Sequence, residues 1–431
     1  MRNYFQFSER KTSFKQETIA GITTFLSMAY ILVVNPVVLS QTGMDKGALF
    51  TATALSAIIG SLLMGLIANY PIGIAPSMGI NAFFTFTVCM GMKIPWETAL
   101  AGVFTAGVLF MILSLLKIRE KIINMIPEDL KYAIAGGIGF FVAFIGLKNA
   151  GIVTSSEATF VTIGNLKSAP TVLAIVCFMI TIILLNRGVK GGIFYGMVLS
   201  TILGIVFGVI KAPHAIMGSI PSLHPTFGVV FGHLDDIFNP KILAVIFIFL
   251  FVAFFDTAGA LIAIASQAGL MKDNQIPNAG KALLADSMSA VVGSILGTST
   301  TASFVESTAG IGVGGRTGFT SIIISACFII SLFFSPVLSI VTPEVTAPAL
   351  IIVGAMMATQ LSKINWSNLA IVIPSFITII MMPLTYSIAT GIALGFILYP
   401  ISMIAMKKTR EVHPFMYVLC VTFIGYFVFV I

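Results

Sequence analysis

The sequence predicts an all-α polytopic membrane protein in which fourteen transmembrane segments form a seven-plus-seven inverted repeat. Three observations lead to this fold class: the composition, the spacing of the apolar blocks and an internal repeat. Of the 431 residues, 58% are hydrophobic and only 9% are charged, whereas about 25% are charged in a typical soluble domain. Because apolar residues extend over the full length of the chain, no stretch is left for a separate soluble domain.

The apolar blocks are long and numerous enough to cross a membrane many times, since one transmembrane helix needs roughly 20 apolar residues. The first repeat covers residues 1–210, the second covers residues 240–410, and residues 413–431 form an extra apolar C-terminal segment. The blocks of the first repeat lie at 17–38, 47–69, 78–91, 97–116, 132–150, 170–186 and 191–210. Those of the second lie at 240–266, 278–297, 303–314, 319–340, 345–360, 367–382 and 385–405.

Short matching segments relate the two groups of blocks. The segment SAIIGSLL that begins at Ser56 in block two matches SAVVGSIL, which begins at Ser289 in block nine. Block one ends near Ser40 and block eight near Ser266, each followed by Gln, and a Pro-Glu pair precedes both block five and block twelve. An odd number of segments per repeat turns the second copy upside down, which is the pattern of secondary transporters.

Two stretches at corresponding places in the repeats, residues 70–84 and 297–315, do not resemble continuous transmembrane helices. The first is interrupted by proline and glycine before Asn81, and the second is rich in hydroxyls and glycine and carries Glu306. We expect each to be a short strand that leads into a half-helix, the third and the tenth segment. Irregular backbone is tolerated at membrane depth only inside the protein. The two strands should therefore pair or cross.

The positions of the basic residues account for the formal net charge of +7. With the N-terminus placed inside, seventeen of the 23 Lys and Arg residues lie at cytoplasmic ends and six at outer ends. This is the positive-inside bias of proteins in the cytoplasmic membrane, so the basicity gives no reason to expect nucleic acid as a partner. The N-terminus has no cleavable signal pattern, and the four cysteines lie in apolar segments without metal spacing.

Three acids fall well inside apolar blocks and are candidates for function: Asp256, Asp286 and Glu306. A carboxyl group within a membrane segment is unfavourable unless it faces the protein interior. Asp256 is placed opposite Tyr30 by the repeat, and its structural alternative is a buried acid bonded to a hydroxyl. Asp286 follows Lys281 closely, so a structural or gating role near the cytoplasmic end fits it as well as a role in coupling.

Glu306 has a second interpretation that needs no ligand. Ser303 and Glu306 have the spacing of a capping box, in which the serine caps the helix and the glutamate reaches back to the serine N–H. A carboxylate at membrane depth needs more than one partner, which favours a functional role over capping alone. Asn81 is likewise either a contact for the edge of a planar heterocycle, because an amide donates and accepts, or only a cap of the first half-helix.

At these motifs the chain resembles the nucleobase–cation symporter-2 superfamily, in particular its branch of adenine, guanine and hypoxanthine permeases. The resemblance rests on FFDTAG with Asp256, on APSMGINAFF with Asn81 and on the half-helix motif with Glu306, and it covers nearly the whole chain. It implies a core domain of about residues 17–116 plus 240–340 and a gate domain of about 132–210 plus 345–405. It also implies uptake of a purine base with a proton.

The resemblance matches Asp256, Glu306 and Asn81 to polar positions of the family, and the expected substrate-binding set contains the two acids and five further residues. These are Asn81, Ala82, Phe84, Thr257 and Ser307. Related uracil and xanthine branches carry a glutamate in the eighth helix and Asn-x-Gly in the tenth, and the departure here argues against those substrates. A uracil or xanthine permease, or an anion transporter of the same fold, is the alternative, although a carboxylate at position 306 repels anions.

A neutral purine can leave water only if its ring N–H groups gain polar partners. A carboxylate accepts two such groups in a charge-assisted pair worth about 1.5–3 kcal/mol per bond, and we assign this role to Glu306. Burial near a second acid raises proton affinity, so the coupled proton is assigned to Asp256, with the reverse assignment left open.

The sequence predicts no cofactor and no metal. The one other arrangement with metal-binding residue types, His214, His224 and His233 in the loop 211–240, has weak spacing for zinc. The expected partners are the purine nucleobase, the proton and the lipid bilayer, and a homodimer is left open.

Overall fold

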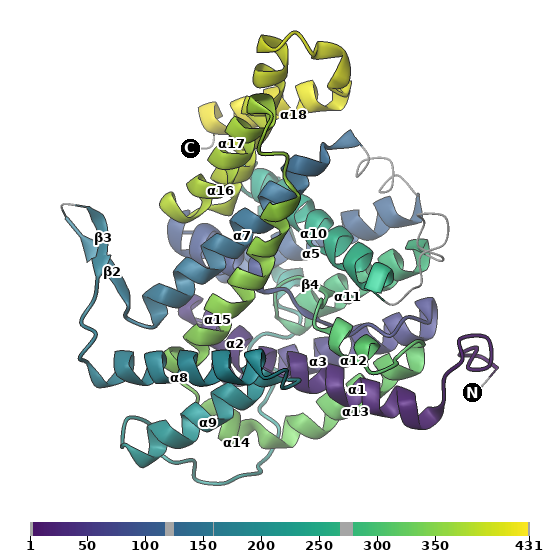
Figure 1. Ribbon diagram of the computed structural model, residues 1–431, viewed down its shortest axis with the longest axis vertical. Coiled ribbons are helices and arrows are strands. Elements are labelled where there is room, and N and C mark those ends of the chain that lie inside the picture. The colour runs from purple at the N-terminus through teal and green to yellow at the C-terminus, as the bar shows by residue number, and fades with distance from the viewer. Residues whose placement is uncertain (1–2, 117–124, 158, 268–278, 430–431) are drawn as a thin grey trace.

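The computed structural model is built almost entirely of helices (Figure 1). It describes residues 3–116, 125–157, 159–267 and 279–429, without the side chains of residues 254–256, 258–267, 279, 339, 426 and 428–429. The helices of the first half are α1 (Phe14–Met28), α2 (Ile31–Leu39), α3 (Lys46–Leu63), α4 (Met78–Ala82), α5 (Trp96–Leu115), α7 (Glu128–Asn149), α8 (Ala169–Asn186) and α9 (Gly192–Val206). Those of the second half are α10 (Pro240–Gln267), α11 (Ala279–Leu296), α12 (Ser307–Gly312), α13 (Gly318–Ser331), α14 (Ser335–Ser339), α15 (Pro343–Ala358), α16 (Leu369–Leu384), α17 (Ile388–Ala405) and α18 (Pro414–Phe429). The strands are β1 (Ile74–Pro76), β2 (Val153–Ser156), β3 (Phe160–Ile163) and β4 (Thr301–Ser303).

Many of these helices have the length and composition of membrane spans. Within the described residues, eight are long and apolar enough to cross a membrane, and further apolar helices are shorter. Two of the shorter segments, α4 with the π-helical Phe83–Gly91 and α9, lie in the first half. The predicted all-helical membrane architecture is therefore confirmed at the level of helix content and apolarity.

The first apolar block is broken, although the sequence predicted one continuous segment over residues 17–38. Helix α1 ends at Met28 and α2 begins at Ile31, so Tyr30 lies at the junction. Pro36 lies within α2 and cannot donate to the carbonyl of Leu32. The preceding turn is tightened, because the N–H of Leu32 donates to the carbonyl oxygen of Ala29 at 3.1 Å, a three-residue rather than a four-residue bond. The break brings a tyrosine to the junction within a buried segment.

Strands β1 and β4 come from the two atypical stretches and pair antiparallel, with Ala75 opposite Ala302. All six strand residues are buried. The backbone groups around the pair find additional partners, since the N–H of Ile74 donates to the Ser61 hydroxyl of α3 at 3.0 Å. The Thr301 hydroxyl donates to that of Ser289 in α11 at 2.8 Å. Neighbouring helices thus satisfy polar groups that a lipid environment would leave unpaired.

The helices pack in two groups whose contacts correspond between the halves of the chain. Helices α1, α3 and α5 of the first half correspond to α10, α11 and α13 of the second. The contact of α3 with α13 corresponds to that of α11 with α5, and the contact of α1 with α13 corresponds to that of α10 with α5. In the other group α8 packs on α9 as α16 packs on α17, and α7 and α15 pack on each other. Figure 1 shows α15 crossing α7 at the left of the α10–α5 group. Both strands therefore lie among α3, α11 and α10, in the first group.

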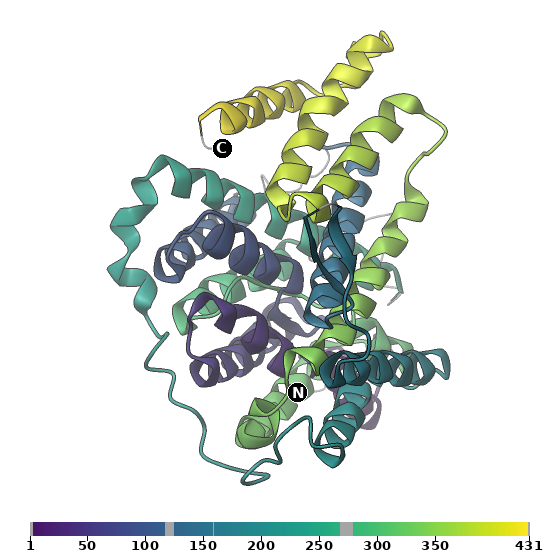
Figure 2. The same ribbon diagram turned by 90° about the vertical axis from the view of Figure 1, so that its left-hand side faces the viewer.

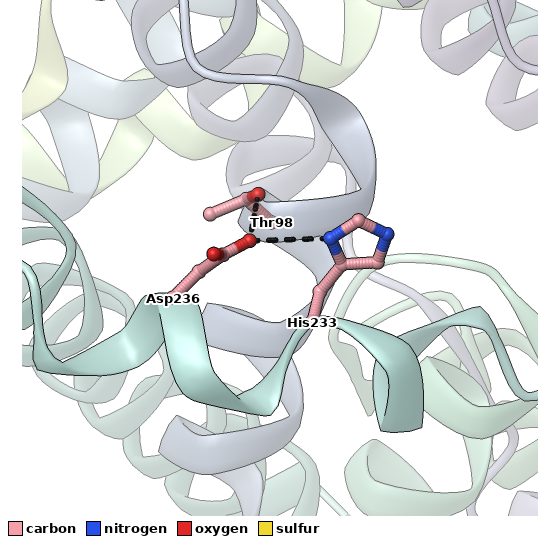
Figure 3. Close-up of polar contacts among 3 residues, drawn as sticks. All are labelled: Thr98, His233 and Asp236. Atoms are coloured by element: carbon pink, nitrogen blue, oxygen red, sulfur yellow. Dashed lines mark hydrogen bonds and ion pairs between the residues drawn. The ribbon is translucent and has the colours of Figure 1, made fainter.

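The polar connection between α9 and α10 runs along the outside of the helices (Figure 2). Near its end the Asp236 carboxylate accepts a hydrogen bond from the Thr98 hydroxyl of α5 at 2.7 Å, and the His233 ring nitrogen Nδ1 lies 3.1 Å from the same oxygen (Figure 3). Among the described residues, no group of three His, Cys, Asp or Glu side chains is arranged to hold a metal ion. These contacts fasten the connection to α5.

The hairpin between α7 and α8 and the packing of the expected C-terminal segment were not predicted by the sequence patterns. Strands β2 and β3 form an antiparallel hairpin between α7 and α8, and Phe160 on it is 87% exposed. The C-terminal helix α18 packs on α17 through buried residues, and the ring of Phe423 stacks on that of Phe396 with centroids 5.6 Å apart. Phe423 also contacts Phe247 of α10, so α18 touches both groups of helices.

Candidate functional site

Glu306 lies where β4 passes into α12, at the N-cap position of that helix. Its side chain is partly exposed, and its Oε1 atom accepts a hydrogen bond from the hydroxyl of Tyr30 at 2.7 Å. Tyr30 itself is 1% exposed, and its ring lies 6.5 Å from the ring of Phe304. The break between α1 and α2 therefore positions a hydrogen-bond donor directly on the acid of the tenth segment.

The capping box predicted for Ser303 and Glu306 does not form. Helix α12 begins at Ser307, three residues later than a capping box at Ser303 requires, and Glu306 makes no side-chain capping bond. The Ser303 hydroxyl donates instead to Oδ1 of Asp286 at 3.1 Å. Ser303 is the last residue of β4, and the strand directs its side chain away from the helix that follows. Capping by this pair consequently does not explain the acid at position 306.

Asp286 is buried in α11 and joins three segments of the site. Its Oδ2 atom accepts a hydrogen bond from Thr257 of α10 at 2.7 Å, while Oδ1 accepts from Ser303 of β4. The side chain has no exposed surface. Thr257 is the neighbour of Asp256, and Ser303 is three residues before Glu306, so Asp286 binds the side-chain hydroxyls of residues close in sequence to both of the other acids. The choice between a structural or gating role of Asp286 and a role in coupling remains a prediction.

Asp256 belongs to α10, and its side chain lies outside the described part of the structure. Helix α10 packs against both β4 and α12, and the next residue, Thr257, is 1% exposed. The element that carries Asp256 is therefore adjacent to the element that carries Glu306. The predicted assignment of the proton to Asp256 remains a prediction.

Asn81 takes part in a buried network of side chains that includes residues just before β4. Helix α4 begins at Met78 and has Ser77 at its N-cap position, so Asn81 lies inside the helix and does not cap it. Its amide nitrogen donates to Asn35 of α2, and its amide oxygen accepts from Ser299. Asn35 in turn donates to Thr298 at 3.0 Å. Asn81 thus connects α2, α4 and the segment before β4.

The remaining predicted site residues are also packed within the protein. Ala82 is 3% exposed, and Phe84 is fully buried with its ring 6.3 Å from that of Phe249 in α10. The hydroxyl of Ser307 accepts a hydrogen bond from the N–H of Gly73, just before β1, at 3.0 Å. Ala82, Phe84 and Ser307 are therefore buried, while Glu306 is a partly exposed acid that follows β4.

The sequence patterns missed three polar partners in the first apolar block: Tyr30, Asn35 and Glu17. The repeat aligns Tyr30 with Asp256 and does not indicate its contact with Glu306. For Asn35 and Glu17, the sequence shows only a polar residue among apolar ones. Asn35 and Glu17 have no exposed side-chain surface, and both accept or donate several hydrogen bonds. Composition identifies such residues as unusual, whereas their partners come from segments far away in the chain.

A helical membrane protein in which two paired strands each lead into a half-helix has the architecture of a secondary transporter. Residues 15–394 match the Permease family, through the model Xan_ur_permease. The chain belongs to this family, and the resemblance noted from its motifs is confirmed. It is a multi-pass membrane transporter and not an enzyme.

Relatives match along essentially their whole lengths. The chain is 55% identical over 438 residues to the guanine/hypoxanthine permease PbuG of Bacillus subtilis (strain 168), with 100% of both chains covered. It is 39% identical over 433 residues to the adenine permease AdeP of Escherichia coli (strain K12), covering 100% of this chain and 96% of that one.

Solved structures of low sequence identity share the fold. The transmembrane domain of the cyanobacterial bicarbonate transporter BicA is 16% identical with a TM-score of 0.62, and the match covers 91% of this chain and 96% of that one. SLC26A9 is 13% identical with a TM-score of 0.64, and the match covers 91% of this chain and 67% of that one. At such identities the similarity extends to the arrangement of helices and strands, and it carries no information about substrate.

Proposed function

We propose that this chain takes up purine nucleobases across the cytoplasmic membrane by proton symport, with guanine and hypoxanthine as substrates and adenine as a further candidate. The observation that carries the proposal is the partly exposed carboxylate of Glu306, which lies beside the paired strands and accepts a hydrogen bond from Tyr30. The relatives named for guanine, hypoxanthine and adenine transport support the choice of substrate.

Substrate recognition is assigned first to Glu306. A ring with adjacent N–H donors can give two hydrogen bonds to one carboxylate, each worth about 1.5–3 kcal/mol because the acceptor is charged. The Tyr30 hydroxyl fixes the rotamer of the acid, which lowers the entropy lost when the substrate binds. Asp256 completes the binding pair. Asn81, Ala82, Phe84, Thr257 and Ser307 act around these two acids by supporting the strands and half-helices.

Proton coupling is assigned to Asp256, with Glu306 as the alternative carrier. Two carboxyl groups that approach each other in a poorly solvated region do not both stay ionised, so one of them takes up a proton. Asp256→Asn should therefore abolish concentrative uptake while exchange of internal for external substrate persists. Equal loss of both activities would remove the assignment of the proton to Asp256.

We propose that the chain has fourteen membrane segments in two inverted repeats, and that transport proceeds by alternating access. The corresponding packing of α3 on α13 and of α11 on α5, repeated in the other group of helices, supports this arrangement. The core domain would contain α1 to α5 and α10 to α14, and the gate domain α7 to α9 and α15 to α17. The bias of basic residues supports an N-terminus in the cytoplasm. Movement of the core against the gate then exposes the site to one side at a time.

The test is uptake of labelled hypoxanthine by a host that lacks its own purine uptake, with adenine, guanine, xanthine and uracil as competitors. We expect guanine to compete strongly and uracil weakly, and we expect a protonophore to abolish accumulation. Competition chiefly by uracil or xanthine would assign the chain to the alternative substrates. If accumulation survives the protonophore but requires sodium, the coupling ion is sodium and not the proton.

A further inference from the structure

Glu17 is a buried acid in the first turn of α1, away from the acids assigned to transport. Its side chain has no exposed surface. Oε1 accepts hydrogen bonds from the hydroxyl of Thr12 at 2.8 Å and from the N–H of Arg316 at 3.0 Å. Oε2 accepts from the N–H groups of Thr317 and Thr320 at 3.2 and 3.3 Å, and from the Thr320 hydroxyl at 2.5 Å. The Glu17 carboxylate thus accepts five hydrogen bonds.

Four of these donors belong to the connection between α12 and α13 and to the first turn of α13, while Thr12 lies just before α1. The connection is short, because α12 ends at Gly312 and α13 begins at Gly318. Arg316 within it donates from its guanidinium group to the carbonyl oxygens of Ile311 and Gly315, both at 2.8 Å. Glu17 therefore anchors to α1 the same connection that closes the C-terminal end of α12.

Helix α1 also contacts α12 itself along its length. A side chain at Gly310 of α12 would overlap the Thr24 side chain and the backbone of Ala20, so the two helices approach closely at this glycine. At the junction that follows α1, Tyr30 donates to Glu306. From Glu17 near the start of α1 to Tyr30 at the junction with α2, this segment therefore contacts the connection after α12, Gly310 within α12 and Glu306 just before it.

We infer that Glu17 is a positioning residue that sets where α12, and with it the Glu306 carboxylate, lies along α1. The inference rests on the proposed function in that Glu306 is taken as the substrate contact. Loss of the anchor at the far end lets the six-residue α12 shift, and a displaced carboxylate no longer matches the Tyr30 hydroxyl and the substrate together. Small displacements of a group that must meet two partners have large effects on binding.

The experiment compares Glu17→Gln and Glu17→Asp with the wild type, and uses Glu9→Gln as a matched control on the exposed part of the N-terminal segment. Glutamine keeps the size of the side chain, but its NH₂ group faces N–H donors that it cannot bond. Uptake of labelled hypoxanthine yields KM and Vmax per folded transporter, and thermal unfolding in detergent is followed in parallel.

We expect Glu17→Gln to raise KM about tenfold, the order that corresponds to roughly one hydrogen bond to a charged group, with Vmax per folded transporter little changed. Glu17→Asp, which keeps the charge, should restore most of the affinity, and Glu9→Gln should match the wild type. In a Glu306→Gln background, binding of labelled hypoxanthine should show little further loss from Glu17→Gln, since the two changes act through one group.

Three results would overturn the inference. An unchanged KM with lower thermal stability would make Glu17 a structural cap of α13 only. Equal losses in Glu17→Gln and Glu17→Asp, with no recovery by the retained carboxylate, would show that charge is not what matters. Additive losses with Glu306→Gln would show that Glu17 acts elsewhere. Failure of the wild type to take up any purine would contradict the proposed function instead.

Discussion

The two strand-and-half-helix arms of the protein have the same topology and different polar chemistry. The first arm, β1 with α4, carries Asn81, whose amide is enclosed between Asn35 and Ser299. The second arm, β4 with α12, carries Glu306, which is partly exposed and bonded to Tyr30. In both arms, irregular backbone lies among apolar helices and is buried within the protein.

The difference indicates a division of labour between related arms. An amide that donates and accepts is satisfied by neutral neighbours inside the protein and holds segments together. A carboxylate accepts only, so it is better suited to a ligand that arrives with N–H donors. The first arm is therefore interpreted as the scaffold and the second as the binding arm, and four substitutions test this comparison.

The largest effect is expected for Glu306→Gln in the second arm. The change removes the charge that strengthens two hydrogen bonds to the substrate, so uptake of labelled hypoxanthine should fall at least about thirtyfold, equivalent to about 2 kcal/mol. The quantity of folded protein, measured by fluorescence-detected size exclusion, should remain that of the wild type. Glu97→Gln, which removes a partly exposed acid from the first turn of α5, is the control and should transport normally. Full uptake by Glu306→Gln would contradict the interpretation of the second arm as the substrate-binding arm.

Asn81→Ala in the first arm should act on stability. The change leaves Asn35 and Ser299 buried without their shared partner, and each orphaned group costs about 1–3 kcal/mol. We expect a lower thermal unfolding temperature in detergent and less folded protein in the membrane, with KM of the surviving molecules close to that of the wild type. If Asn81→Ala is as stable as the wild type but has a raised KM, the first arm contributes to substrate binding and is not only a scaffold.

Tyr30→Phe should have a smaller effect on the second arm. The substitution keeps the buried ring beside Phe304 and removes only the hydroxyl that donates to Glu306. Because water can replace that donor on a partly exposed acid, KM should rise by about threefold to tenfold. The measurement is concentration-dependent uptake, with stability as the control. An unchanged KM would mean that the tyrosine only packs against its neighbours.

The smallest effect is expected outside both arms, at the loop contact of Figure 3. Hydrogen bonds from Thr98 and then from His233 lower the pKa of Asp236 below its usual value. Because the pKa is lowered in the folded protein, the contact stabilises at pH values above the ordinary aspartate pKa and loses its effect as the pH falls through the lowered value. Asp236→Asn should reduce thermal stability slightly near neutral pH and match the wild type in acid. Asp235→Asn is the control, and a stability loss independent of pH would exclude this explanation.

Sequence patterns predicted the positions of the apolar blocks and the importance of the stretches that contain Asn81 and Glu306. They could not predict the partners of individual side chains. Ser303 had a plausible local partner in Glu306, yet it donates to Asp286, because the strand turns its hydroxyl toward α11. Spacing along the chain describes local bonds well, whereas bonds between distant segments depend on how helices pack.

The break at Tyr30 is a second case of this limit. An apolar block that contains Pro36 is compatible with a kinked helix or with two helices, whereas the sequence predicted one continuous segment. The tertiary contact with Glu306 decides which residue lies at the junction. A buried acid such as Glu17 is similarly ambiguous, because an acid at the start of an apolar block is common at a membrane surface.

The pairing of β1 with β4 also has a consequence for biosynthesis. Ala75 and Ala302 lie more than half the chain apart, and the ribosome completes β1 long before β4 exists. During that interval the N–H and C=O groups of β1 have no strand to bond, and lipid offers them no substitute. Until the second repeat is synthesised, the first repeat must therefore remain either in contact with the insertion machinery or in a loosely packed, hydrated conformation. Each half of this transporter is completed by the other, so the order of synthesis becomes part of how the site is assembled.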